Sequence, residues 1–202
     1  MNNEADLKSI FNFLKTAREL QHVERATPHP NGRQENDAEH SWAVALACVL
    51  VASRLSKEFG VALDQTKMLK MALIHDLAEV GTGDTKTWDD ASRVNKEEKE
   101  REVMQNMIKS LPQDVADEIS SLWEECEKKE TLEAQIVKSI DRFDPVIHRT
   151  AFGVGWKGID EEHASITAVD SRQEPRHSFS KTLTRLYEII RLEADSKGVF
   201  KA

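Results

Sequence analysis

The stretch from Ala72 to Asp84 places a histidine and an aspartate, His75 and Asp76, where an otherwise apolar helix is expected to end. A second acid, Glu79, follows one turn later, and Gly81 is the expected stop of that helix. Burying an imidazole and two carboxylates is costly unless a partner compensates them. A divalent metal ion is one such partner. The alternative is a surface turn with solvated acids and a core histidine, so other parts of the chain must decide.

The composition suits a soluble helical protein with one sizeable core. The chain has 202 residues, of which 39% are hydrophobic and 32% charged, and its net charge is -8. A surface of this sign repels polyanions, which argues against nucleic-acid polymers and anionic membranes as partners. A small phosphorylated metabolite stays compatible, because a local metal and one or two arginines can override the global field.

Cysteine usage and the chain start favour a cytoplasmic protein. Cys48 and Cys126 are the only cysteines, and they form no CxxC spacing, so neither a disulfide scaffold nor a cysteine zinc site is indicated. The first residues lack the basic and apolar parts of a signal peptide. The longest apolar run, Trp42–Ala52, falls short of the roughly 20 residues that span a bilayer.

The hydrophobic periodicity predicts an all-α fold: one helical bundle with a central buried helix. Residues 4–23 have the spacing of a helix with one buried stripe, which contains Leu7, Ile10, Phe11, Leu14, Ala17 and Leu20. The segment 25–36, with two prolines and a glycine, is predicted to be a loop. Asn36 and Glu39 form a capping-box pattern before a helix that is apolar on nearly every side and therefore central.

Further helices are predicted along the rest of the chain. They start at Asp64, within a charged outer segment at 89–107, at Pro112, at Thr131 (ending at 141–145) and at about 178 (ending near 194). No segment alternates with period two, and no repeat or clean linker divides the chain. We therefore expect a single domain over residues 1–202, with a core at about 7–150 on which the helix at about 178–194 packs.

Three separate places offer metal ligands on otherwise apolar helices: His40, the pair His75 and Asp76, and Asp141. Two imidazoles and two carboxylates suit Mn, Co, Ni, Fe or Zn, and such a set leaves coordination positions open. Each residue has a structural alternative. His40 alone is compatible with a satisfied core histidine, and Asp141 alone with a helix cap.

This order of residues resembles the HD-domain metallophosphohydrolases, and more closely the bacterial 5′-deoxynucleotidases and their eukaryotic HD-containing relatives. The segment 39–41 (Glu-His-Ser) is similar to their first ligand segment, and residues 75–84 are similar to their central motif. Asp141 falls where the last ligand is expected, and Arg25 has the spacing before His40 of an active-site arginine. The resemblance covers roughly residues 7 to 150, and the C-terminal quarter shows no match.

The resemblance implies one divalent metal ion (Mn, Co, Mg, Zn, Ni or Fe) held by His40, His75, Asp76 and Asp141. Asp76 then also belongs to the catalytic residues. No histidine occurs between Asp76 and His148, which favours a site for a single metal. His148 lies seven residues after Asp141 and is compatible with the same helical face, or with the core.

The same resemblance implies roles for three further residues. Glu79 is expected to orient or deprotonate the attacking water, Arg25 to contact phosphate, and Asp84 to contact a sugar hydroxyl. Ala26 follows Arg25, whereas the bacterial enzymes that select deoxyribose carry a tryptophan there. Selectivity against the 2′-hydroxyl therefore stays open.

The predicted function is metal-dependent hydrolysis of a phosphomonoester, a (deoxy)nucleoside 5′-monophosphate. One alternative is an enzyme for another phosphate ester or a nucleoside polyphosphate, although such a substrate calls for more Lys and Arg near the site than the sequence suggests. Another is a non-catalytic nucleotide-binding regulatory module, which has no need of the four ligands and Glu79 together. The expected partners are a small nucleotide or phosphate ester and, by resemblance only, a second copy in a homodimer.

Overall fold

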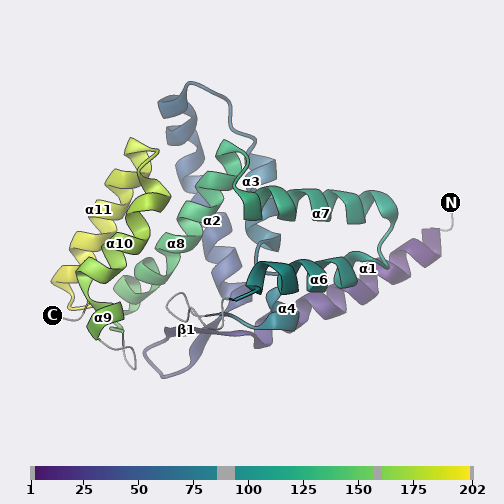
Figure 1. Ribbon diagram of the computed structural model, residues 1–202, viewed down its shortest axis with the longest axis horizontal. Helices are drawn as coiled ribbons and strands as arrows, with labels where there is room; N and C mark the ends of the chain where they lie inside the picture. The colour runs from purple at the N-terminus through teal and green to yellow at the C-terminus, as the bar shows by residue number, and fades with distance from the viewer. Residues whose placement is uncertain (1–2, 86–93, 157–160, 201–202) are drawn as a thin grey trace.

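The computed structural model describes residues 3–85, 94–156 and 161–200, and it is built mainly from helices (Figure 1). The two termini lie at opposite ends of the molecule in Figure 1. The elements in chain order are α1 (Asn3–Ala17), η1 (Arg18–His22), β1 (Glu24–Pro28), β2 (Gln34–Asn36), α2 (Asp37–Phe59), α3 (Gln65–Ile74), α4 (Glu79–Thr82), α6 (Lys96–Ile108), α7 (Gln113–Lys128), α8 (Leu132–Phe152), α9 (Glu161–Ala164), α10 (Ile166–His177) and α11 (Lys181–Ser196).

The main hydrophobic core lies between α2, α3, α8 and α11. Buried side chains from all four helices meet there, including Val44, Met71, Ile140 and Leu183. A second cluster joins η1, α6 and α7 around Trp123, whose indole N–H donates to the carbonyl of His75 at 3.3 Å. The turn that carries His75 is therefore supported from the α7 side as well as by α3.

The helix starts follow the sequence signals. The backbone N–H of Glu39 donates to the Asn36 side chain at 3.0 Å, and the Glu39 carboxylate accepts from the Asn36 backbone at 3.2 Å. This capping box begins α2 as predicted. Asp64 caps α3, and Thr131 caps α8.

The segment 25–36, predicted as a loop, is instead an antiparallel hairpin of β1 and β2. Its two prolines are placed where no ladder hydrogen bond is lost: Pro28 ends β1, and Pro30 lies in the connecting turn. Gly32 has φ 87 in that turn, a conformation that favours glycine. The prolines and the glycine thus led to the prediction of a loop where two short strands form, while the fold class stays all-α.

The helix predicted to run on to Gly81 breaks after Ile74. Residues 75–78 form turns, α4 follows as one short turn of helix, and Gly83 with φ 74 ends it. Gly81 lies inside α4, and a Cβ there would approach the Val103 side chain to 2.8 Å. Close packing against α6 therefore requires this glycine.

Two apolar surfaces predicted to be buried are exposed. The helix α2 is central through one face, but Trp42, Leu46, Val49 and Leu50 on another face are 44–65% exposed. In α1, Ile10, Phe13 and Ala17 pack on the second cluster, whereas Leu7, Phe11 and Leu14 are exposed. A helix with apolar residues all round carries no sequence signal that selects the buried side. Among the described residues, no helix has the length and apolar character to cross a membrane.

The helices of the C-terminal part of the chain are more extensive than the sequence predicted. The helix α8 continues through Pro145 to Phe152 instead of ending at 141–145. Proline supplies no N–H to the carbonyl four residues earlier, which belongs to Asp141, so the helix tolerates a local defect beside that residue. The last helix, α11, forms where it was predicted, while α10 forms in a stretch for which no helix was predicted. Residues 89–93 of the predicted outer segment lie outside the described residues.

Candidate active site

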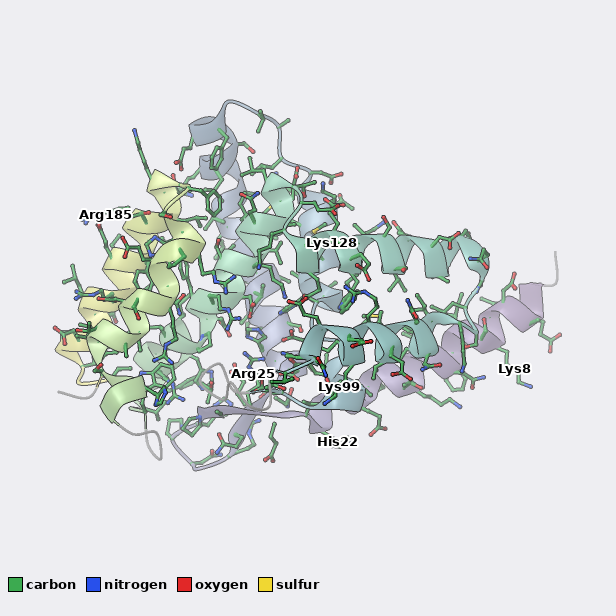
Figure 2. All side chains as sticks on the ribbon, in the orientation of Figure 1. Lys8, His22, Arg25, Lys99, Lys128 and Arg185 are labelled. Atoms are coloured by element: carbon green, nitrogen blue, oxygen red, sulfur yellow. The ribbon has the colours of Figure 1, made fainter. Side chains whose placement is uncertain are left out.

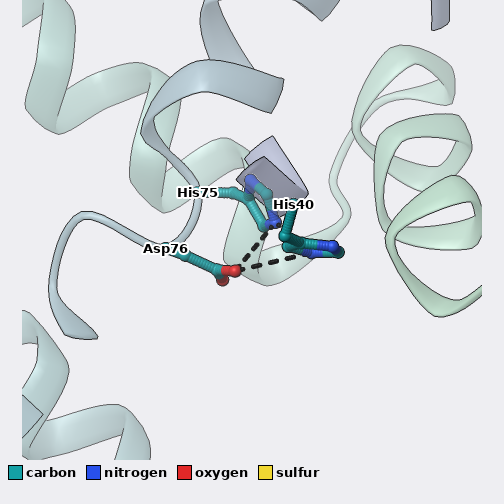
Figure 3. A group of neighbouring side chains, drawn as sticks. All are labelled: His40, His75 and Asp76. Carbon is teal, nitrogen blue, oxygen red and sulfur yellow. Dashed lines mark hydrogen bonds and ion pairs between the residues drawn. The ribbon is translucent and has the colours of Figure 1, made fainter. Parts of the chain in front are cut away.

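The four predicted metal ligands converge on one point from three elements. His40 lies in the first turns of α2, His75 and Asp76 lie in the turn after α3, and Asp141 lies in α8. His40 Nε2 is 3.4 Å from His75 Nε2 and 3.1 Å from Asp141 Oδ1. Asp76 Oδ2 lies 3.2 Å from His75 Nε2 and 3.6 Å from His40 Nε2, as Figure 3 shows. Two imidazole nitrogens and two carboxylate oxygens are thus brought together.

The outer nitrogen of each imidazole has its own acceptor. His40 Nδ1–H donates to Asp144 Oδ2 at 2.7 Å, and His75 Nδ1–H donates to the Ala72 carbonyl at 2.9 Å. Such bonds fix the ring orientation and the tautomer that directs the Nε2 lone pair into the cluster. Asp144 was not among the predicted site residues, although its spacing of three residues after Asp141 on one helix was an available signal.

The electrostatics of the cluster favour a cation at its centre. Burial and the charge of Arg25 act to lower the pKa of His40, but hydrogen bonds with Asp141 and Asp144 outweigh them and raise it to about 10. Burial acts to raise the pKa of Asp76, but the neighbouring imidazoles of His75 and His40 outweigh it and lower this pKa. A divalent metal supplies the same positive charge in place of a proton. The donor set therefore fits a divalent metal ion, and the ligand atoms of His40, His75 and Asp76 already lie within 4.8 Å of one another.

Glu79 lies beside this cluster and is buried. Its carboxylate and those of Asp37 and Asp76 have oxygens within 4.8 Å of one another. Burial, with the charges of Asp76 and Asp37, raises the pKa of Glu79 to about 11. Lys96 of α6 donates to Glu79 Oε1 at 3.0 Å. The sequence predicted only a charged outer segment here, so the contact of Lys96 with Glu79 comes from tertiary packing alone.

Arg25 reaches the cluster from the hairpin. Its Nη1 donates to Asp37 Oδ1 at 2.8 Å and to Asp76 Oδ2 at 3.3 Å, and its Nε lies 3.7 Å from Glu35 Oε2. In Figure 2, Arg25 lies toward the middle of the molecule, whereas Lys8 and Arg185 lie at opposite ends. The hairpin thus places a nearly buried guanidinium next to the cluster, and the phosphate-binding role that the resemblance implied for it stays a prediction.

His148 lies outside this cluster. Its Nδ1 is 3.0 Å from Glu35 Oε1, and its Nε2 is 3.3 Å from the Pro28 carbonyl. Both ring nitrogens are thus engaged with the hairpin. Of the two readings that the sequence left open, the structural one accounts for these contacts.

A cavity of about 510 Å³ opens beside the four-residue cluster. Arg25, Asp84 and Asp141 are among its lining residues, so three of the predicted site residues share one space, and we call their part of the lining the metal end. The C-terminal part of the chain, including Trp156 and Gln173, supplies the part of the lining that we call the far end. The quarter of the sequence that matched nothing therefore forms half of the site.

The cavity also corrects one expectation from the sequence. Few basic residues were expected near the site, yet five of the eleven arginines among the described residues line this cavity: Arg25, Arg142, Arg149, Arg172 and Arg176. Four of them come from α8 and α10, far along the chain from the predicted motif. Their place in the cavity could not be predicted from sequence spacing, because only the fold brings these arginines close to the motif.

The chain matches known proteins over most of its length. A family model described as an HD domain covers residues 17–181. A 5′-deoxynucleotidase, HDDC2, of Dictyostelium discoideum is 30% identical over 98% of this chain and 100% of its own length. The human 5′-deoxynucleotidase HDDC2 is 28% identical over 72% of this chain and 69% of its own length.

Solved structures of phosphohydrolases are also similar to this chain. A crystal structure of a predicted metal-dependent phosphohydrolase from Magnetospirillum magnetotacticum has a TM-score of 0.83 and 31% identity, covering 100% of this chain and 99% of that one. An HD-domain phosphohydrolase from Listeria innocua has a TM-score of 0.62 at 18% identity and shares the fold. The family implies a divalent metal ion, for which the described residues offer fitting groups. The fold, the motif and these relatives together show that the chain belongs to the HD-domain family.

Proposed function

We propose that this protein hydrolyses (deoxy)nucleoside 5′-monophosphates to a nucleoside and inorganic phosphate, using one divalent metal ion. The main support is geometric: two histidines and two aspartates converge, and one of them, Asp141, also lines a cavity whose size suits a nucleotide-sized ligand. The relatives named 5′-deoxynucleotidases support the substrate class. The enzyme is a phosphohydrolase in this proposal, because the cluster adjoins a group suited to activate water.

The metal would be held by His40, His75, Asp76 and Asp141, with Asp144 fixing the His40 ring. When bound, a divalent metal supplies Lewis-acid stabilisation of charge on phosphoryl oxygens and makes water more acidic. The cluster leaves room for that chemistry because four protein groups leave open coordination positions around most divalent metals.

Glu79 is the group proposed to orient the attacking water and accept its proton. Burial and the charges of Asp76 and Asp37 raise its pKa, and a cation bound at the cluster would offset those charges and favour the ionised form that this role needs. Its Oε2 is buried and has no hydrogen-bond partner among the described residues, so this oxygen is available to a water molecule. Lys96 holds the other carboxylate oxygen and so fixes the direction in which Oε2 points. Glu79 is therefore a base positioned from α6 rather than a free side chain.

Arg25 and Asp84 are proposed to hold the substrate on either side of the scissile bond. A guanidinium presents a planar set of donors that suits phosphate oxygens, and the acids around Arg25 keep it oriented. Asp84 lines the same cavity and would accept a hydrogen bond from a sugar hydroxyl. Because Ala26 contributes only a methyl group beside Arg25, we do not restrict the sugar to deoxyribose.

One observation favours a second candidate, hydrolysis of a nucleotide that carries more than one phosphate. Five arginines line the cavity, and guanidinium groups suit phosphate oxygens. This candidate ranks second because the full-length relative that supports the family is named for monophosphate-type chemistry, a 5′-deoxynucleotidase.

The test is phosphate release from a nucleotide panel of mono-, di- and triphosphates, with Mn, Co, Mg or no metal added. We expect release from monophosphates that depends on metal and falls by about 100-fold or more in Glu79→Gln, since general bases contribute about 10²–10⁴-fold. Glu188→Gln, an exposed glutamate on α11, is the matched control. Cleavage confined to polyphosphates would favour the second candidate. Tight nucleotide binding without release under any metal would favour a regulatory module.

We also propose that a second copy of the chain packs on the exposed apolar stripe of α2. Trp42, Leu46, Val49 and Leu50 recur at helical spacing on the surface, and contiguous exposed apolar surface of this kind marks interaction sites. A symmetric dimer would pair the stripe with itself. Light scattering is expected to give the dimer mass for the native chain and the monomer mass for Leu50→Glu. A monomeric native chain at micromolar concentration would disprove this pairing.

A further inference from the structure

The C-terminal part of the cavity lining carries polar and aromatic groups of its own. Trp156 follows the end of α8, and Gln173 lies in α10, and both line the same cavity as Arg25 and Asp141. A phosphate group bound at the four-residue cluster would occupy only a small part of about 510 Å³. A group attached to that phosphate would extend into the rest of the cavity, which Trp156 and Gln173 help to line.

Gln173 carries a buried hydrogen-bond acceptor, its side-chain oxygen Oε1. The residue is 8% exposed, and its amide nitrogen donates to the Arg142 carbonyl at 2.8 Å. That bond assigns the orientation of the amide and leaves Oε1 as the remaining group. Oε1 has no hydrogen-bond partner among the described residues. Because a buried acceptor without a donor is unfavourable, a ligand donor in the cavity would complete its bonding.

Trp156 is held in place by a buried arginine. The Arg149 guanidinium lies 3.9 Å from the centre of the Trp156 ring, and Arg149 is 1% exposed. Arg149 also donates to the carbonyls of Gly155 and Ala26. It thus ties the hairpin, the end of α8 and the indole together. An aromatic ring fixed in this way is a suitable surface for stacking a planar group, because little further side-chain entropy is lost when the ligand binds.

A planar group with donors at its edge is the ligand chemistry that fits both features. Nucleobases have this chemistry: their faces stack on aromatic side chains, and their edges carry N–H donors. Adenine and cytosine present exocyclic amino groups, whereas thymine presents a carbonyl at the corresponding position. An acceptor such as Gln173 Oε1 therefore distinguishes these bases.

We infer that Trp156 and Gln173 form the nucleobase subsite of this enzyme, with Trp156 stacking on the base and Gln173 Oε1 accepting a hydrogen bond from its amino group. This inference rests on the proposed hydrolysis of nucleoside monophosphates and adds the residues that select the nucleoside. It predicts a preference for amino-bearing bases over thymine. Both residues are specificity determinants and take no part in the chemical step.

The experiment compares kcat/KM for dAMP, dCMP and dTMP with that for 2-deoxyribose 5-phosphate, which has no base. The native enzyme is expected to prefer dAMP to the base-free substrate by at least tenfold. Trp156→Ala is expected to reduce this ratio about tenfold, mainly through KM, and Trp156→Phe to restore most of it. Gln173→Met, which keeps the side-chain length without the acceptor, is expected to remove the preference for dAMP and dCMP over dTMP.

A binding measurement separates recognition from turnover. Quenching of tryptophan fluorescence by deoxyadenosine is expected in the native protein and is expected to be lost in Trp156→Phe. Leu192→Ala, an exposed substitution on α11, is the control that should match the native protein.

The outcomes distinguish this inference from the proposed function. If no nucleoside monophosphate is hydrolysed and none binds, the proposed function fails and takes the subsite with it. The second outcome is that monophosphates are hydrolysed but the kcat/KM ratios stay within twofold of native. These ratios are dAMP over the base-free substrate in Trp156→Ala, and dAMP and dCMP over dTMP in Gln173→Met. In that case the proposed function stands and the subsite is wrong. Deoxyadenosine quenching that persists in Trp156→Phe would also overturn it.

Discussion

The two ends of the cavity are built in different ways. At the metal end, each functional group comes from a short motif in a buried setting, and the groups support one another: Asp144 orients His40, and Lys96 holds Glu79. At the far end, the lining residues are ordinary members of α8 and α10 and of the segment between them. The comparison teaches that the chemistry lies in residues that a motif can reveal, while the proposed selectivity lies in residues that only packing brings into the site.

The largest effect is expected for Asp76→Ala at the metal end. Loss of a charged ligand weakens metal binding and removes several kcal/mol of transition-state stabilisation. At about 1.4 kcal/mol per tenfold, this corresponds to a rate lower by roughly 1,000-fold. Metal content measured by elemental analysis is expected to fall with it. Asp117→Ala, an exposed acid on α7, is the control. Unchanged metal content in Asp76→Ala would show that the ligand assignment is wrong.

A smaller effect is expected for Asp144→Asn, which leaves all four proposed ligands in place. The carboxylate that accepts from His40 Nδ1 at 2.7 Å becomes a neutral amide, so the ring is less well oriented and less basic. Changes of this kind cost about 10–100-fold in metal affinity. Titration with a metal chelator as competitor measures the affinity. Native affinity in the variant would mean that Asp144 only satisfies a buried hydrogen bond.

The far end is tested by Arg149→Met, which keeps the length of the side chain and removes its donors. The carbonyls of Gly155 and Ala26 lose their partner, so we expect the free energy of unfolding to fall by about 1–3 kcal/mol. Metal content should be native, whereas the preference for dAMP over the base-free substrate should fall. Urea unfolding and the same substrate pair provide the measurements. Loss of metal in this variant would show that the two ends are not independent.

The smallest effect is expected for Gly81→Ala, at the short helix between the motif and α6. The added methyl meets the partly buried side chain of Val103 at 2.8 Å, and overpacking there costs about 1 kcal/mol. Because α4 positions Glu79, a modest loss of rate should accompany the loss of stability. Val103→Ala in the same chain should restore both, as measured by thermal unfolding and phosphate release. Equal loss in the single and double variants would exclude this contact as the cause.

The helical fold was largely accessible from the sequence, and the all-α class and the family are confirmed. Helix starts at Asn36, Asp64 and Thr131 followed local signals, because a cap depends only on residues three positions apart. The hairpin was missed because its strands are three to five residues long and flank a turn that contains Pro30 and Gly32. The break after Ile74 was missed because the apolar period continues across it.

The sequence by itself determined the family, the helical class and the set of residues proposed to bind metal, because those residues are chemically unusual where they occur. A histidine and an aspartate in an apolar helix end are costly without a partner, and that cost is visible locally. Only the tertiary structure decided which further groups join them: Asp144 and Lys96 at one end of the cavity, Trp156 and Gln173 at the other. Their contacts join elements far apart in the chain, and neither composition nor periodicity records such distances.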